Sequence, residues 1–584
     1  MTAVGMPREK PFHSVFVHAP DPYYADTQNY GARFAPLWAY TLAAYIPRDG
    51  RFTWALCDTR FDDLAATEAA DVFLFSGINQ DYSSLQRARA LVKNRFPTAR
   101  TVIGGPICWS FDQAGDLDRL RDFDHIVIGD GELGFGPLLE NLSKGLSEEQ
   151  VIRAKGRFPI DQARPIDSAL LSGTLGRYYG AVVEVSRGCP FLCEFCDIRV
   201  LEDNNRPHNK EPSLIIADIE QCCRLGARQI LLACDNLIGD PRWAEHLVDC
   251  LLEWQERTGF RPSLYTWLTV NLFRHPRLMG KMRRAGFDML FVGIESFTAN
   301  SLLETAKLQN SATSLVDAVR EIQSRGFIVV AGLIFGFDSD TPDSFRETLD
   351  GLSASGLLSG DPSLLTALPG TPLFRRMKLA GRLRDVRYGL GGFKYQTNIK
   401  YLMPRDEMVN GYRSFVATYN SGEYQFQRLR NYFALLNQGN FVPLRSEGYG
   451  QLRLFAKNVA HNRAARRQLL LRIGRFAAAP RRVYFALRGL LFTLLQVKIP
   501  GRLGYLQFWL FAWSNSVLKY SSLSERDFDI ESVAPGFDIR DILPAGYAET
   551  ADEPVPANKI AAQLHSTCKQ LRRLIERRLN PSVP

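Results

Sequence analysis

Short apolar runs that end in Gly, Pro or Asp alternate with helical patterns over the first 385 residues of this 584-residue chain. The early runs are HSVFVHAP, FTWALCD, DVFLFSGI, RTVIGGP and DHIVIGD, and the segment YSSLQRARALVKNRF between two of them has apolar residues at three- and four-residue spacing. Apolar strands that alternate with helices are typical of a parallel sheet. The pattern predicts an α/β fold, and with 46% hydrophobic and 23% charged residues it excludes a largely disordered, collagen-like or coiled-coil chain.

The alternation divides the chain into four parts. The pattern predicts a Rossmann-like domain over residues 1–154. The segment 155–178, which is interrupted by prolines, is predicted to be a linker. Residues 179–385 carry the runs AVVEVSRG, QILLAC, LYTWLTV, MLFVGIE, FIVVAGLIFGF and SLLTALPG, which predict an open, partial (β/α)6 barrel. The alternation then stops, and residues 386–584 predict a mainly helical, basic C-terminal domain.

Glycines follow the strands of the first section. Because ligands of parallel sheets bind at the carboxyl ends of the strands, glycines there let the backbone approach a ligand closely. A strand-to-helix turn needs glycine for its own sake as well, so both interpretations remain open for any one position. Together the glycines indicate a cleft of nucleotide or cofactor size, and the residues concerned are Gly77, Gly104, Gly105, Gly129 and Gly131.

The segment CPFLCEFC at 189–196 is the strongest chemical signal in the chain. Its thiols, Cys189, Cys193 and Cys196, follow directly on a predicted strand and can close around one metal centre. Iron–sulfur cubanes take four ligands, so three cysteines leave one iron open to a substrate or cofactor. Zinc is the competing metal, but structural zinc takes four protein ligands and only His208 lies near. Inert packed thiols have no reason to cluster at a strand end.

This CxxxCxxC spacing, with an aromatic residue before the last cysteine, resembles the signature of the radical S-adenosylmethionine (SAM) superfamily. Supporting motifs follow in the order that the superfamily has: DN at 235–236, GIES at 293–296, GLIFG at 332–336 and PGTP at 369–372. The first domain, with IGGP and IGDGE, resembles the cobalamin-binding domain of the class B radical SAM methyltransferases. The resemblance covers roughly residues 10–385.

The resemblance implies the cofactors and their ligands. The three cysteines would hold a [4Fe–4S] cluster, SAM would chelate its open iron, and an electron from the cluster would release a 5′-deoxyadenosyl radical. Phe195 would pack against the adenine, and Gly332 and Gly336 would let the backbone approach it. The ribose would bind to Glu295 and Ser296, and the SAM ammonium to Asp235 or to Asn236 beside it.

Cobalamin would bind to the first domain through its glycines and Glu132. The sequence lacks the DxHxxG loop whose histidine ligates cobalt in many cobalamin proteins, because His125 follows Asp122 by three residues and precedes Gly129 by four. If cobalamin binds, its lower axial ligand is therefore not expected to be histidine. Alternatively, the domain has kept the fold and lost the cofactor.

The leading hypothesis is a cobalamin-dependent radical SAM methyltransferase that acts on an unactivated carbon of a small-molecule or lipid substrate, with a reductant such as flavodoxin or ferredoxin. One alternative uses the same cofactors for rearrangement, cyclisation or C–C coupling, and another is a non-catalytic iron–sulfur binding protein. A methylthiotransferase would need three more cysteines in its first domain, where only Cys57 and Cys108 lie.

Positive charge is concentrated near the C-terminus. The whole chain has a net charge of +9, yet residues 448–524 hold thirteen basic and no acidic residues, so the remainder carries −4. The runs VYFALRGLLFTLLQVKI and LGYLQFWLFAWSNSVL predict either a buried helical cap or an interfacial anchor, in which Trp509 and Trp513 would lie at a membrane surface. Their aliphatic content favours peripheral lipid contact through 450–520 over nucleic acid.

The location follows from two further features. The first twenty residues lack the apolar core of a secretory signal, and the ten cysteines are too sparse and unevenly placed for a disulfide framework. A cytoplasmic protein is expected, and membrane association through the basic region is the alternative to a buried helical cap.

Overall fold

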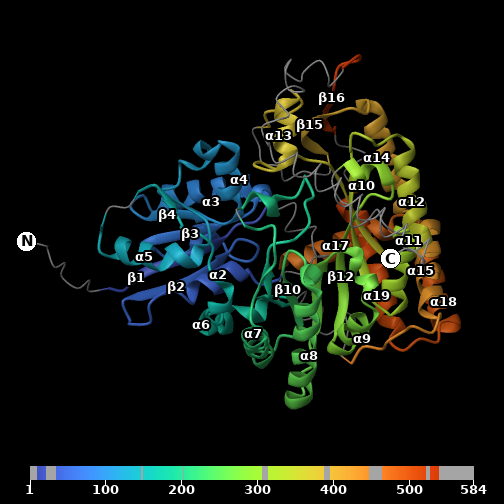
Figure 1. Ribbon diagram of the computed structural model, residues 1–584, viewed down its shortest axis with the longest axis horizontal. Coiled ribbons are helices and arrows are strands. Elements are labelled where there is room, and N and C mark those ends of the chain that lie inside the picture. Colours follow the sequence, from blue (N-terminus) through green and yellow to red (C-terminus); the bar gives the residue numbers. More distant parts are fainter. Residues whose placement is uncertain are drawn as a thin grey trace, which may run out of the picture.

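The computed structural model shows an N-terminal α/β domain beside an open barrel, with helices packed on the far side of the barrel (Figure 1). It describes residues 10–21, 34–146, 149–201, 203–304, 314–386, 395–445, 463–520 and 527–537. Residues 450–462 of the predicted lipid-contact region lie outside this set.

The first sheet is parallel throughout, and within the described residues its strand order is β2-β1-β3-β4-β5-β6. This is the flavodoxin-like order, in which the direction of winding changes between β1 and β3 and ligands bind at the carboxyl ends there. The strands are β1 (Phe12–His18), β2 (Phe52–Asp58), β3 (Val72–Ser76), β4 (Arg100–Gly104), β5 (His125–Ile128) and β6 (Val151–Arg153). Five of them were predicted; the three residues of β6 are too few to form a pattern.

Helices cover both faces of this sheet. α2 (Leu37–Ala43) and α5 (Gly131–Ser143) pack on one face, and α3 (Tyr82–Arg95) and α4 (Pro106–Ala114) pack on the other. The apolar residues of each strand alternate between the two cores, as a sheet that is buried on both sides requires.

The second sheet has the parallel order β14-β13-β12-β11-β10-β7, and in the described residues β7 and β14 do not pair with each other. The predicted α/β class and open barrel are thereby confirmed. The strands are β7 (Ala181–Glu184), β10 (Gln229–Ala233), β11 (Ser263–Leu268), β12 (Phe287–Glu295), β13 (Ile328–Phe335) and β14 (Ser359–Leu364). The outer helices are α7 (Pro212–Arg224), α8 (Pro241–Thr258), α9 (Pro276–Ala285), α11 (Leu315–Ser324) and α12 (Asp343–Ser355).

The predicted position of the last strand is wrong. The run SLLTALPG at 363–370 was expected, whereas β14 begins at Ser359 and reads SGDPSL. Pro362 lacks an N–H, and a strand tolerates this at the edge of a sheet, where one side of the backbone has no neighbour.

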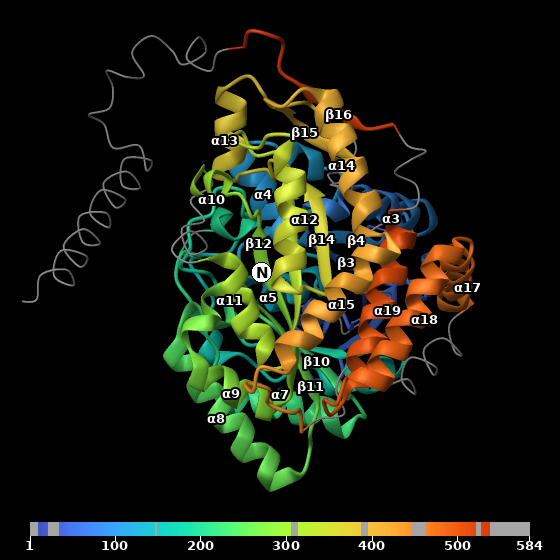
Figure 2. The ribbon, with the colours of Figure 1, turned by 90° about the vertical axis from the view of Figure 1, so that its right-hand side faces the viewer.

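The C-terminal helices lie beside the open barrel, and the last of them closes its inner side (Figure 2). They are α14 (Arg405–Tyr419), α15 (Gly422–Leu436), α17 (Arg463–Ala477), α18 (Pro480–Gln496) and α19 (Arg502–Lys519). Trp509 and Trp513 of α19 are fully buried and donate hydrogen bonds to the carbonyls of Gln425 and Asn420. For α19 the predicted buried helical cap is therefore confirmed, and the alternative, in which the two tryptophans lie at a membrane surface, is wrong.

Candidate active site

The cysteine loop lies at the carboxyl end of β7. Its backbone is fixed at its start, where the Cys189 N–H donates to the Asn204 carbonyl at 3.0 Å. Gly188 has a φ of +87°, and a Cβ there would stand 2.2 Å from the Arg206 carbonyl oxygen. Only glycine fits at this position, so the turn that presents the loop depends on it.

The three loop cysteines are free thiols. Cys193 is buried and the other two are half-buried, and burial raises the pKa of Cys189 to about 11. Binding to iron must therefore displace protons. Among the described side chains no three His, Cys, Asp or Glu converge on the position of a single ion. Thiolates of a cubane each bind a different iron, so a cluster does not require such convergence on one position.

Asp235 and Asn236, at the end of β10, hold the same loop. Asp235 accepts the Gly188 N–H at 2.6 Å, and burial raises its pKa to about 6. The Asn236 amide lies 3.9 Å from the Cys189 sulfur and accepts the Thr269 N–H through its oxygen. The structure thus gives both side chains a loop-positioning contact; the role of Asp235 at the SAM ammonium stays a prediction.

Glu295 ends β12 in an unusual backbone conformation. Its φ is +65°, and the register between β12 and β13 shifts beside it. Non-glycine residues with positive φ are uncommon and gather at functional sites. A Cβ built on Gly332 would lie 3.6 Å from the Glu295 carboxylate, so these two predicted residues are neighbours across the strands.

The other predicted SAM residues have local contacts. The Ser296 hydroxyl accepts the Thr298 N–H at 3.0 Å, and Phe195 lies 6.3 Å from Phe337 between ring centroids. Gly336 has a φ of +103°, and a Cβ there would stand 2.4 Å from the Tyr401 ring. The packing of Tyr401 therefore requires this glycine whatever it binds.

A charged network that the sequence did not reveal clamps the cysteine loop. Arg376 of α13 (Pro372–Leu379) pairs with Glu194 between the cysteines at 2.5 Å and with Asp338 at 2.7 Å. Asp338 also pairs with buried Arg382 at 2.6 Å, and Glu304 lies 3.4 Å from Arg376. Glu194 and Arg376 are 182 residues apart, so no local pattern could join them.

The glycines of the first domain have structural causes of their own. Gly105 and Gly129 have φ of +85° and +107°, and a Cβ on Gly77 would meet Leu85 of α3 at 2.7 Å. A Cβ on Gly131 would lie 3.1 Å from Leu42, while one on Gly104 would make only ordinary contacts. Tight turns and close packing explain most of these glycines. The contact of the glycines with cobalamin stays a prediction.

Glu132 connects the two domains. Its carboxylate pairs at 2.5 Å with Arg187, which precedes the cysteine loop and also contacts Glu184 and buried Asp130. The sequence predicts that Glu132 binds cobalamin. In the structure Glu132 forms an ion pair with Arg187, and its role at cobalamin stays a prediction. His125 begins β5, at the opposite edge of the sheet from Gly129, and so lies away from the ligand edge.

A cavity of about 440 Å³ lies between the first domain and the barrel domain, and none of the predicted cobalamin residues is among those that line it. Its lining comes from both domains, with Asn79 and Tyr82 on one side and Phe374 and Lys378 of α13 on the other. Asn79 is buried, and among the described residues its side-chain oxygen has no hydrogen-bond partner. An unpaired buried acceptor in an interdomain cavity fits a polar ligand.

A three-cysteine loop at the mouth of an open parallel barrel defines a radical SAM enzyme. The radical SAM superfamily profile matches residues 183–352, and a domain of unknown function (DUF4070) matches residues 371–503. The chain belongs to the radical SAM superfamily, and the predicted superfamily is confirmed.

Two relatives carry this assignment. An uncharacterized methyltransferase of Synechocystis sp. is 30% identical over 69% of this chain and 74% of its own length. The hopanoid C-2 methylase of Rhodopseudomonas palustris is 31% identical over 51% of this chain, which spans 56% of that relative.

Two solved structures share the fold. The cobalamin-dependent SAM radical enzyme OxsB, solved with aqua-cobalamin and SAM, matches at a TM-score of 0.54 with 13% identity, over 93% of this chain and 84% of that one. The radical SAM methyltransferase TsrM from Kitasatospora setae was solved with cobalamin and a [4Fe–4S] cluster. It matches at a TM-score of 0.53 with 14% identity, over 75% of this chain and 92% of that one.

Proposed function

We propose that this protein is a cobalamin-dependent radical SAM methyltransferase that methylates an unactivated carbon of a small-molecule or lipid substrate. The observation that carries the proposal is the three-thiol loop at the mouth of the barrel, tied by Arg187 to the ligand edge of a flavodoxin-like domain. When bound, the cluster with SAM supplies a 5′-deoxyadenosyl radical, cobalamin supplies a methyl group from a second SAM, and an external reductant supplies the electrons.

The residues of the chain would bind and orient these groups. The loop cysteines would ligate the cluster, with Asn236 donating to the Cys189 sulfur, a contact that tunes such ligands. Glu295 would hold the SAM ribose and Gly332 would leave room for its adenine. The barrel walls and α19 would exclude water, which a carbon radical requires.

The first domain would hold cobalamin at the carboxyl edge of its sheet, and the neighbouring interdomain cavity would offer the Asn79 side-chain oxygen as one acceptor. We place the domain boundaries at 1–154, 155–178, 179–385 and 386–584. Segment 155–178 is a linker that includes the short helix α6 (Ser168–Thr174).

Product analysis under anaerobic conditions tests the proposal. The full chain would be reconstituted with iron, sulfide and cobalamin and given SAM, reductant and candidate substrates. Methylation yields S-adenosylhomocysteine together with 5′-deoxyadenosine, whereas a rearrangement, cyclisation or coupling yields only 5′-deoxyadenosine. A cluster spectrum without SAM cleavage would contradict both activities and leave an iron–sulfur binding protein.

The exposed face of α17 and α18 supports a second statement, that the protein contacts the membrane surface peripherally. Among the described residues, fifteen large hydrophobic side chains are exposed, and nine of these lie between Leu470 and Leu503. On α18, Leu487, Leu491 and Leu495 are 55%, 56% and 75% exposed, at helical spacing along one face. None of the described helices combines the length and hydropathy needed to cross a bilayer.

Exposed basic residues flank this apolar face, among them Arg466, Arg475, Arg481 and Lys498. An interfacial helix has leucines that enter the bilayer surface and basic side chains that reach anionic head groups. The partner that matches both the apolar face and the basic residues is an anionic lipid surface.

Vesicle flotation tests the membrane contact without any cofactor. The wild-type chain is expected to float with vesicles of phosphatidylcholine and phosphatidylglycerol in equal parts, and less so at high salt. Leu487→Glu should weaken partitioning about tenfold or more, because one buried leucine contributes roughly 1.5–3 kcal/mol. Leu379→Glu, on α13 and 64% exposed, is the matched control. A wild-type chain that stays in the soluble fraction would contradict the contact.

A further inference from the structure

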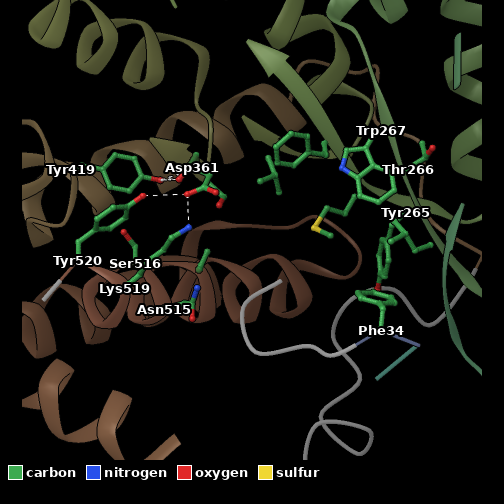
Figure 3. A pocket seen from close by; sticks show the side chains of 17 residues that line it. Phe34, Tyr265, Thr266, Trp267, Asp361, Tyr419, Asn515, Ser516, Lys519 and Tyr520 are labelled. Atoms are coloured by element: carbon green, nitrogen blue, oxygen red, sulfur yellow. Dashed lines mark hydrogen bonds and ion pairs between the residues drawn. The ribbon is translucent and has the colours of Figure 1, made fainter. Parts of the chain in front are cut away.

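A second cavity, of about 300 Å³, lies inside the barrel (Figure 3). The inner residues of five strands, β10 to β14, form one wall, and α19 forms the other. A cavity of this size, enclosed by strands that lead toward the cysteine loop, has the dimensions of a small-molecule site.

The two ends of the cavity differ in chemistry. Phe34, Tyr265 and Trp267 gather at one end, and Asp361, Lys519 and the residues around them gather at the other (Figure 3). Met289 and Phe291 also line the cavity, so its walls are mostly apolar and aromatic. The cavity therefore suits a molecule with an extended apolar body and one polar end.

The charges at the polar end balance each other. Lys519 is buried, and its ammonium donates to Asp361 at 2.6 Å. The Tyr520 hydroxyl donates to the same carboxylate oxygen at 3.2 Å. A carboxylate or phosphate ligand would add a second negative charge beside Asp361, so the pair disfavours an anion.

Hydrogen-bonding capacity at this end is not used up. Ser516 is only 8% exposed, and in the part of the chain that the structure describes its hydroxyl has no hydrogen-bond partner. Asp361 is the one hydrogen-bond acceptor that the described residues give to the three N–H groups of Lys519. Ser516 and Lys519 lie three residues apart on α19 and line the same cavity. Buried donors without acceptors are costly, and a ligand oxygen would satisfy them.

We propose that this cavity binds the substrate, and that the substrate is an apolar, ring-containing molecule with a neutral hydroxyl or carbonyl oxygen. The oxygen would accept from Lys519 and from the Ser516 hydroxyl, and the apolar body would lie against Trp267 and Met289. This inference rests on the proposed function only in calling the bound molecule the substrate. Binding itself requires neither the cluster nor turnover.

Three naphthyl probes of nearly equal shape test the inference: 2-naphthol, naphthalene and 2-naphthoate. Their binding to the full chain without cofactors can be measured by equilibrium dialysis, since the ring is fluorescent. The wild-type chain should bind 2-naphthol about fivefold more tightly than naphthalene and more tightly than 2-naphthoate, as expected for one extra hydrogen bond.

Variants then locate the probe. Ser516→Ala should reduce 2-naphthol affinity about fivefold and leave naphthalene unchanged. Ser514→Ala is the control, because Ser514 lies on α19, donates to the Phe511 carbonyl and does not line the cavity. Ala512→Phe, which fills the cavity from α19, should abolish binding of both neutral probes.

Three results would overturn the inference: no binding of 2-naphthol, binding that survives Ala512→Phe, or equal effects of the two serine substitutions. A chain that binds as expected and yet forms no methylated product would instead contradict the proposed function. The two failures are thus distinguishable.

Discussion

Replacing Arg376 with methionine should loosen the cysteine loop without touching a cysteine. The guanidinium contacts Glu194, Asp338 and Glu304, and its side chain is 30% exposed while theirs are 15–17% exposed. Methionine keeps the apolar stem of the side chain but removes all three ion pairs. Asp338 retains Arg382, so Glu194 in the loop is the group that loses most.

The magnitude follows from this partial burial. Removing one partner of a fully buried pair costs about 3–5 kcal/mol, whereas exposed pairs contribute about 0–1 kcal/mol. A network at this depth should therefore lose about 2–3 kcal/mol, which would raise the population of open loop roughly 30- to 160-fold. An open loop holds its cluster poorly, since the three thiolates must stay together to bind it.

Iron and sulfide content after anaerobic reconstitution, and the rate of SAM cleavage, measure the effect. We expect Arg376→Met to lower both, and Arg376→Lys to lower them less. Lys281→Met is the control: it removes a cation that pairs with Glu245 and Asp249 between the outer helices α8 and α9, away from the cysteine loop. Wild-type cluster content and cleavage in Arg376→Met would refute the idea that this network positions the loop.

Three further predictions concern the site and the two domains. Alanine at all three loop cysteines should abolish cluster absorption and SAM cleavage while circular dichroism stays unchanged. Burial lowers the pKa of His18 to about 4, below its value of about 6.5 in the unfolded chain, so the unfolded state binds the extra proton. Its contribution to stability should be present above pH 6.5 and lost as the pH falls toward 4, by up to about 3 kcal/mol in denaturant unfolding, and His18→Gln should remove that slope. Gly336→Ala should lower stability well beyond the roughly 1–2 kcal/mol expected for Gly381→Ala; both have positive φ, but only the first Cβ would meet a neighbour, Tyr401.

The fold was predictable where its signals are local. Each strand of the first sheet that the sequence predicted is a compact apolar run that ends in a turn residue, and the same residues form the buried strand. The cysteine motif is local too, because one loop of eight residues contains all three thiols. Spacing alone is sufficient to predict features of this kind.

Contacts between distant segments left no such signal. Glu194 and Arg376 read as ordinary charged residues until the chain folds, and Pro362 argues against a strand unless its edge position is known. Trp509 and Trp513 illustrate the same limit: an apolar helix has one composition whether protein or lipid covers it. The structure buries α19 and exposes its neighbour α18, a difference that only packing decides.

Arg187 links the two halves of the proposed chemistry. It lies two residues before the first cysteine, and its guanidinium pairs with Asp130 and Glu132 at the end of β5, which are almost fully buried. A buried pair holds one geometry, since separating its charges inside the protein is costly. The carboxyl edge of the first sheet and the cysteine loop therefore cannot move apart without breaking these pairs. In the proposed reaction, a methyl donor held at one edge and a radical formed at the other would have to reach the same carbon, and a rigid connection between the two edges would favour that alignment.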